Sequence, residues 1–99
     1  MQLGVTAADL RATATAPSPP DGIGPLLRSL WFDAHGDWEM AHRIAQEDES
    51  RDGAWVHAYL HRKEGDASNA AYWYARAARP MTQTGLDEEW HAIAHALLG

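Results

Sequence analysis

Apolar residues in this chain recur every three or four positions, which is the spacing of one face of an α-helix. The first series consists of Ile23, Leu26, Leu27, Leu30, Trp31 and Ala34. Further series follow, separated by Gly-Asp turns or short polar stretches. They predict five helices, running from Asp21 to Gly36, Asp37 to the acidic run 46–50, Asp52 to Gly65, Asp66 or Ser68 to Arg79, and Thr84 to Leu97. We therefore expect an all-α fold whose short loops join successive helices as antiparallel hairpins.

The first 20 residues contrast with this pattern, because residues 12–22 are almost all Ala, Thr, Pro, Ser, Asp and Gly. Such a composition buries little apolar surface and cannot offset the entropy lost on ordering. We expect residues 1–20 to form a flexible N-terminal arm. The alternative is that residues 5–10 form one helical turn that docks on the body. Residues 21–99 are then a single helical domain.

An internal repeat organises the predicted helices. Residues 36–41 (GDWEMA) can be laid over residues 65–70 (GDASNA) with an offset of 29 positions. In each copy the glycine ends one helix and the aspartate begins the next. The alanine that closes each copy lets neighbouring helices approach closely.

This repeat resembles the tetratricopeptide repeat and its Sel-type relatives, and residues 71–78 (AYWYARAA) look very like the second helix of a Sel-type repeat. The resemblance covers residues 25–79, with three departures, one of which is His57 at a position where the family often has leucine. The offset is shorter than the ~34 residues of the tetratricopeptide family, and Ala45 stands where an aromatic residue is expected. The resemblance implies two tetratricopeptide-like antiparallel hairpins, with the fifth helix as a C-terminal capping helix. Residues 55–66 also resemble a block in small bacterial proteins, which implies no activity.

From the same resemblance we expect a protein-interaction or scaffold module in the bacterial cytoplasm, with a protein or peptide partner on its concave face. The candidate partner-binding residues are Phe32, His57, His61, Arg62, Glu64, Asn69 and Tyr72. The simpler interpretation is that the aromatic residues among them belong to the core and its rim. Two repeats form a shallow groove, and three are usually needed for independent stability, so a homodimer is a further possibility.

The pattern of histidines indicates an alternative function, in which this helical protein binds a metal ion. The six histidines include two pairs spaced four apart on one predicted helix: His57 with His61, and His91 with His95. Such pairs point the same way and can share a zinc or iron ion. Two Glu-x-x-His triplets, Glu39/His42 and Glu88/His91, have the spacing found in di-iron bundles, but the predicted helices are short for such a bundle. The simpler interpretation makes these histidines boundary residues of the apolar stripes, so no metal or cofactor is expected.

The amino-acid composition disfavours several other folds and functions. Alanine supplies 19 residues while valine and isoleucine together supply five, which disfavours a β-fold. The chain has no cysteine, which excludes disulfides and thiolate zinc sites, and its net charge of −6 opposes nucleic-acid binding as the main task. No apolar run approaches the ~20 residues of a membrane span. With no nucleophile elbow, phosphate loop or dinucleotide fingerprint, we expect no enzyme. The five tryptophans fall one to each predicted helix and are expected to be core anchors.

Overall fold

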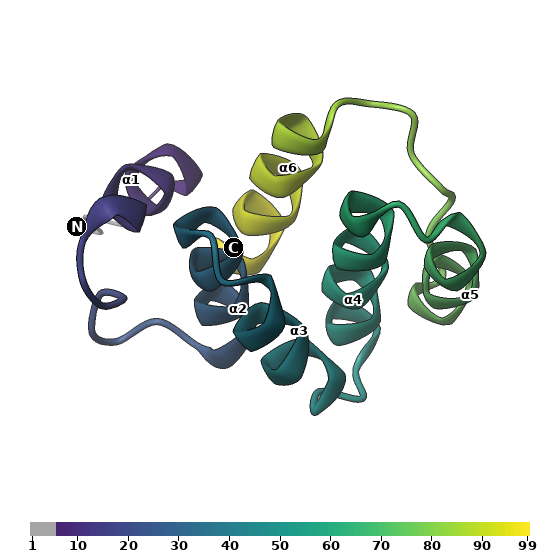
Figure 1. Cartoon of the computed structure of the whole chain (residues 1–99), viewed down its shortest axis with the longest axis horizontal. Coiled ribbons are helices and arrows are strands. Elements are labelled where there is room, and N and C mark those ends of the chain that lie inside the picture. Colours follow the sequence, from purple (N-terminus) through teal and green to yellow (C-terminus); the bar gives the residue numbers. More distant parts are fainter. Residues whose placement is uncertain (1–5) are drawn as a thin grey trace.

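The computed structural model describes residues 6–99, in which α-helices alternate with short turns and no β-strand is present (Figure 1). The all-α prediction is thus confirmed at the level of fold class. These residues form six α-helices rather than the predicted five, namely α1 (Ala7–Ala12), α2 (Pro25–His35), α3 (Trp38–Gln46), α4 (Arg51–Glu64), α5 (Ala67–Ala77) and α6 (Leu86–Leu98). None of the helices in this part of the chain is both long and apolar enough to cross a bilayer. Their arrangement as structural repeats stays a prediction.

The two Gly-Asp turns act as the sequence predicts. Gly36 and Gly65 adopt left-handed conformations, with φ of 103° and 92°, and end α2 and α4. Asp37 and Asp66 then begin α3 and α5, because each side chain accepts a hydrogen bond from a backbone N–H three residues later. Local chemistry therefore fixes both turns.

Three other helix starts differ from the prediction. The N-caps are Ser50 rather than Asp52 for α4, Gly24 rather than Asp21 for α2, and Gly85 rather than Thr84 for α6. The Ser50 hydroxyl accepts a hydrogen bond from the Gly53 N–H at 3.0 Å, so α4 begins two residues before the prediction. At α2 and α6 a backbone conformation suitable for helix entry replaces the side-chain cap.

The expectation of a flexible arm over residues 1–20 needs correction within the described residues. Helix α1 continues into a 3-10 turn (Thr13–Thr15), and both pack against α2, while α1 also contacts α6. Leu10 is fully buried there, and the indole N–H of Trp31 donates to Thr13. Arg11 pairs with Asp87 at 3.0 Å. The structure thus agrees with the alternative of a docked helical turn, and the local signal for it is the Thr6–Asp9 capping box, which begins α1.

Helix α4 lies at the centre of the fold and packs against α2, α3, α5 and α6 (Figure 1). Every residue from Gly53 to His61 is buried, so this helix has no solvent-facing stripe along that stretch. Its polar side chains therefore need partners inside the protein. No buried side-chain nitrogen or oxygen in the described residues lacks a hydrogen-bond partner.

Buried Glu89 joins α6 to α4 and α5. Its carboxylate accepts hydrogen bonds from the Tyr74 hydroxyl at 2.6 and 2.8 Å, from the Trp55 indole at 3.3 Å and from the Arg62 guanidinium at 2.8 Å. Burial, and then the bond to Glu89, raises the pKa of Tyr74. Since its partners occupy this carboxylate, we interpret Glu89 as structural.

Buried Asp33 joins α2 to α4 through hydrogen bonds in a similar way. It accepts hydrogen bonds from the Tyr59 hydroxyl at 2.8 Å and from the Lys63 ammonium at 2.9 Å. Burial, followed by the charge of Asp33, raises the pKa of Tyr59, which therefore remains a hydrogen-bond donor. Asp33 thus fixes the distance between the two helices.

Candidate metal centre

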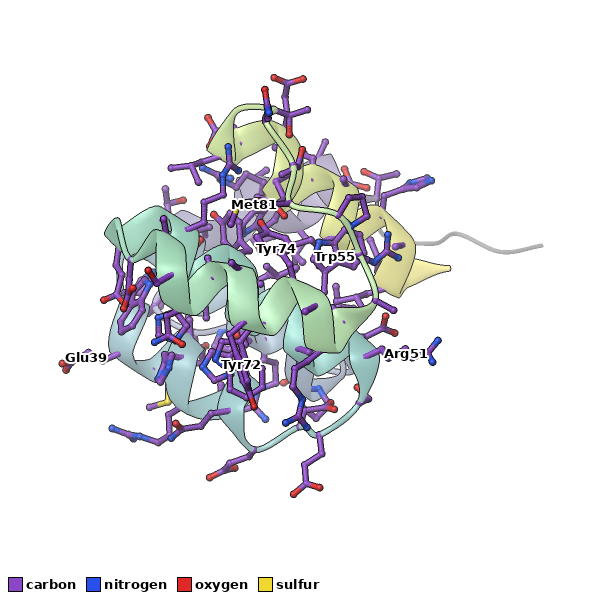
Figure 2. The ribbon with its side chains drawn as sticks, turned by 90° about the vertical axis from the view of Figure 1, so that its right-hand side faces the viewer. Glu39, Arg51, Trp55, Tyr72, Tyr74 and Met81 are labelled. Atoms are coloured by element: carbon purple, nitrogen blue, oxygen red, sulfur yellow. The ribbon has the colours of Figure 1, made fainter. Side chains whose placement is uncertain are left out.

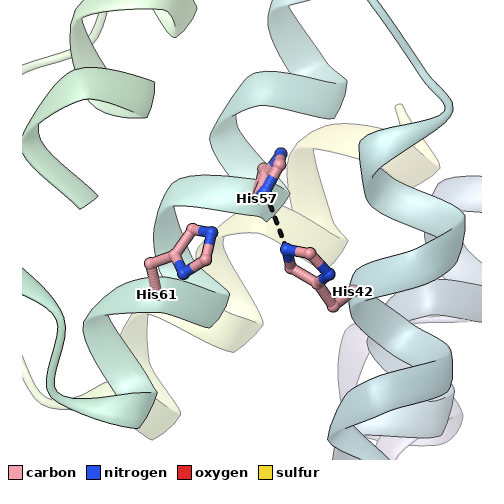
Figure 3. A group of neighbouring side chains, drawn as sticks. All are labelled: His42, His57 and His61. Carbon is pink, nitrogen blue, oxygen red and sulfur yellow. Dashed lines mark hydrogen bonds between the residues drawn. The ribbon is translucent and has the colours of Figure 1, made fainter. Parts of the chain in front are cut away.

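Three imidazole rings meet between α3 and α4 (Figure 3). His57 and His61 lie four residues apart on α4, and His42 reaches them from α3, which packs alongside. The Nε2 atoms of His42 and His57 are 2.9 Å apart, and one ligand nitrogen from each of the three rings lies within 4.8 Å of the other two. Such a convergence of nitrogens from two helices matches the donor set of a transition-metal site.

Tryptophan side chains hold two of these rings in place. Trp73 of α5 stacks on His57, with ring centroids 3.9 Å apart, and Trp38 of α3 stacks on His42 at 4.9 Å. The indole N–H of Trp38 also donates to the Leu60 carbonyl at 2.9 Å, which anchors the indole to α4. These two tryptophans are half-buried, whereas Trp31, Trp55 and Trp90 are core residues as predicted.

Burial lowers the pKa of two rings of the cluster, His57 and His42. His57 is 5% exposed, and burial, followed by the neighbouring rings of His42 and His61, lowers its pKa to about 4. Burial and the proximity of His61 also lower the pKa of His42. Because a metal ion binds the deprotonated imidazole, protons do not compete at these two rings near pH 7.

His61 has its Nδ1 atom 2.7 Å from the Glu64 carboxylate. A carboxylate can only accept, so the proton of this hydrogen bond belongs to Nδ1, and in the neutral ring the other nitrogen, Nε2, carries the lone pair. Asp66 lies close to the same side of His61, so that His61, Glu64 and Asp66 form a second group of potential metal ligands. Glu64 and Asp66 are both exposed.

The structure gives the two predicted histidine pairs different surroundings. Neither group of potential ligands in residues 6–99 contains His91 or His95. On α6 the Nδ1–H of His91 donates to the Asp87 carbonyl at 2.8 Å, and His95 is exposed. The third potential ligand, His42, was not predicted to join His57 and His61. The sequence analysis linked it with Glu39 instead, through the Glu-x-x-His spacing.

The candidate partner-binding residues are distributed over several surroundings. Of these residues, His57, His61 and Glu64 come together at the cluster. Arg62 instead points toward α6, where it contacts Glu89 and the Thr84 carbonyl. Asn69 lies in the first turn of α5 and Phe32 packs edge-on against Trp31. Tyr72 is 53% exposed and lies on the outer side of α5 (Figure 2).

No protein-family model, curated protein or solved structure matches this chain. The resemblance to tetratricopeptide and Sel-type repeats therefore stays a prediction based on residues 25–79.

Proposed function

We propose that this protein binds a divalent transition-metal ion, with zinc as the best match, through the imidazoles of His42, His57 and His61. The observation that carries the proposal is the convergence of three ligand nitrogens within 4.8 Å of one another between α3 and α4. Two of the three residues, His57 and His61, are 5% and 6% exposed. A surface cluster of histidines would not have this burial.

The hydrogen-bonding capacity of the rings favours an ion over a purely structural cluster. His42 and His57 can share only one proton along their Nε2–Nε2 contact, and His61 adds a further free Nε2. The three nitrogens therefore offer more lone pairs than protons at one place. A cation between them would displace that shared proton and use a lone pair on each of the three nitrogens.

The chemistry and dimensions suit zinc. Imidazole nitrogen is a preferred ligand of Zn²⁺, Cu²⁺ and Ni²⁺, and three such ligands leave a fourth position for water. Zinc–nitrogen bonds of about 2.0–2.1 Å in tetrahedral geometry separate the ligand nitrogens by about 3.3 Å. This value lies between the 2.9 Å that separates the Nε2 atoms of His42 and His57 and the 4.8 Å within which all three ligand nitrogens lie. Small side-chain rotations would thus complete the site.

Calorimetric titration of the untagged protein with Zn²⁺ tests the proposal. We expect one ion per chain, and loss of binding in His42→Ala and His61→Ala variants whose helical circular dichroism is unchanged. The matched control is a His91→Ala/His95→Ala double variant, which removes a pair with the same spacing outside the cluster and should bind like the wild type. A wild-type protein that takes up no zinc, cobalt or nickel would refute the proposal.

A second candidate function is the protein-interaction module that the repeat resemblance implies. It is supported by Tyr72, an exposed large aromatic residue on the outer side of α5, whose ring is covered on one side by the Arg76 guanidinium at 5.8 Å (Figure 2). Aromatic and arginine side chains are enriched where partners bind. A Tyr72→Ala variant should then lose a partner captured by the wild type, whereas the His91→Ala/His95→Ala variant should retain it.

A further inference from the structure

Glu64 contacts His61 on the Nδ1 side of the ring. Its Oε2 atom is 2.7 Å from His61 Nδ1, and the two side chains differ in exposure, 38% for Glu64 against 8% for His61. Glu64 is the last residue of α4, three positions after His61, so both side chains project from the same side of the helix. The carboxylate thus holds the buried ring from the surface.

We infer that Glu64 is a positioning residue of the proposed metal centre, which fixes His61 in its Nδ1–H tautomer and so presents the Nε2 lone pair to the ion. This inference rests on the proposed function. A neutral imidazole carries its proton on either nitrogen, and the tautomer is set by the hydrogen bond that the ring makes. Here the partner of Nδ1 is an acceptor, so the ligand nitrogen is Nε2.

Two features separate this role from ordinary helix stabilisation. A negative charge in the last turn of a helix lies at the negative end of the helix dipole, so the dipole does not favour Glu64 at this position in α4. The neighbouring carboxylate, Asp66, is already engaged, because it caps α5 through Asn69 at 3.2 and 3.4 Å. Glu64 is therefore the carboxylate that is bonded to the ring.

Carboxylates that bond the distal nitrogen of a metal-bound histidine orient the ring and increase its basicity, and their loss typically weakens metal binding about 10- to 100-fold. In addition, the negative charge of Glu64 offsets part of the charge that a divalent ion would bring into a buried site. Both effects act on the metal-bound state and neither requires Glu64 to touch the ion.

The experiment compares Glu64→Ala with Glu39→Ala. Glu39 is an exposed carboxylate three residues before His42, and its side chain points away from the body (Figure 2). Its replacement changes the net charge equally but leaves the His61 contact intact. Long-range ¹H–¹⁵N correlation spectra of the metal-free proteins report the tautomer of His61, and Zn²⁺ titration reports the affinity.

We expect wild type and Glu39→Ala to hold His61 as the Nδ1–H tautomer and to bind Zn²⁺ with similar affinity. Glu64→Ala should shift His61 toward the Nε2–H tautomer and bind Zn²⁺ about 10- to 100-fold more weakly. An unchanged tautomer in Glu64→Ala would overturn the inference, and so would an unchanged affinity. If the wild type binds no metal, the proposed function fails, while the spectra of the metal-free proteins still decide whether Glu64 sets the tautomer.

Discussion

Acidification is expected to destabilise the metal-free protein through His57. The folded structure holds the pKa of this residue at about 4 against an ordinary value of 6.5, first by burial and then by the nearby rings of His42 and His61. Trp73, which covers the ring from α5, carries no charge, and Glu64, which contacts His61, raises the pKa of His42 but is not among the groups that shift His57. The unfolded chain therefore takes up a proton at a higher pH than the folded protein does.

The sign and size of the effect follow from this difference. A group with a lowered pKa in the folded state contributes no loss above its unfolded pKa, and stability falls as the pH decreases from about 6.5 toward 4. Each pH unit in that interval costs about 1.4 kcal/mol. Between pH 7 and pH 4.5 the free energy of unfolding should therefore drop by about 2 kcal/mol on account of His57. The lowered pKa of His42 acts in the same direction.

Urea unfolding followed by circular dichroism, in the presence of EDTA at pH 7 and pH 4.5, measures this loss. The comparison protein is His57→Gln, which keeps a polar group opposite His42 but cannot titrate. The buried carboxylates Asp33 and Glu89 are present in both proteins, so their contribution cancels in the difference. Wild type should lose about 2 kcal/mol more than the variant. Equal losses in the two proteins would refute the assignment of a buried neutral imidazole at this position.

Three further outcomes are expected. Zn²⁺ at 100 times its Kd should raise the free energy of unfolding of the wild type by about 2.7 kcal/mol and that of His61→Ala hardly at all, as a thermal-shift series would report. Leu10→Ala should cost about 2–5 kcal/mol in urea unfolding because this side chain is fully buried, whereas a loss below about 0.5 kcal/mol would mean that α1 is not docked. Glu89→Ala should cost about 3–5 kcal/mol because it leaves the Arg62 guanidinium without its buried partner, while the exposed control Glu47→Ala should stay within about 0.5 kcal/mol.

The sequence predicts well those features that neighbouring residues decide. The Gly36-Asp37 and Gly65-Asp66 turns are correct because a left-handed glycine and an aspartate cap act within a few residues. Helix α1 was given only as the alternative to a flexible arm because its stability depends on distant surfaces. Its anchor Leu10 is a single apolar residue in a polar stretch, and the contact of Arg11 with Asp87 spans 76 positions.

The candidate centre could be predicted only in part. The spacing of His57 and His61 indicates that both rings point the same way. Glu64 was predicted as well, but as a partner-binding residue. His42 could not be assigned to them, because its position depends on how α3 is rotated against α4. The stacking of Trp73 on His57 likewise depends on how α5 packs across α4.

The two histidine pairs differ in burial because the helices that carry them are packed differently. Both have the same spacing, but α4 is packed on four sides, whereas α6 leaves His95 exposed. Burying a neutral imidazole costs desolvation that an apolar side chain of similar size would avoid, so packing alone does not explain three such rings at one place. Under the proposed function, coordination supplies the compensation. The burial that lowers the pKa of His57, and so weakens the protein in acid, also keeps its lone pair available to a metal ion at neutral pH. The predicted acid sensitivity and the proposed metal binding would thus have one physical origin in the central position of α4.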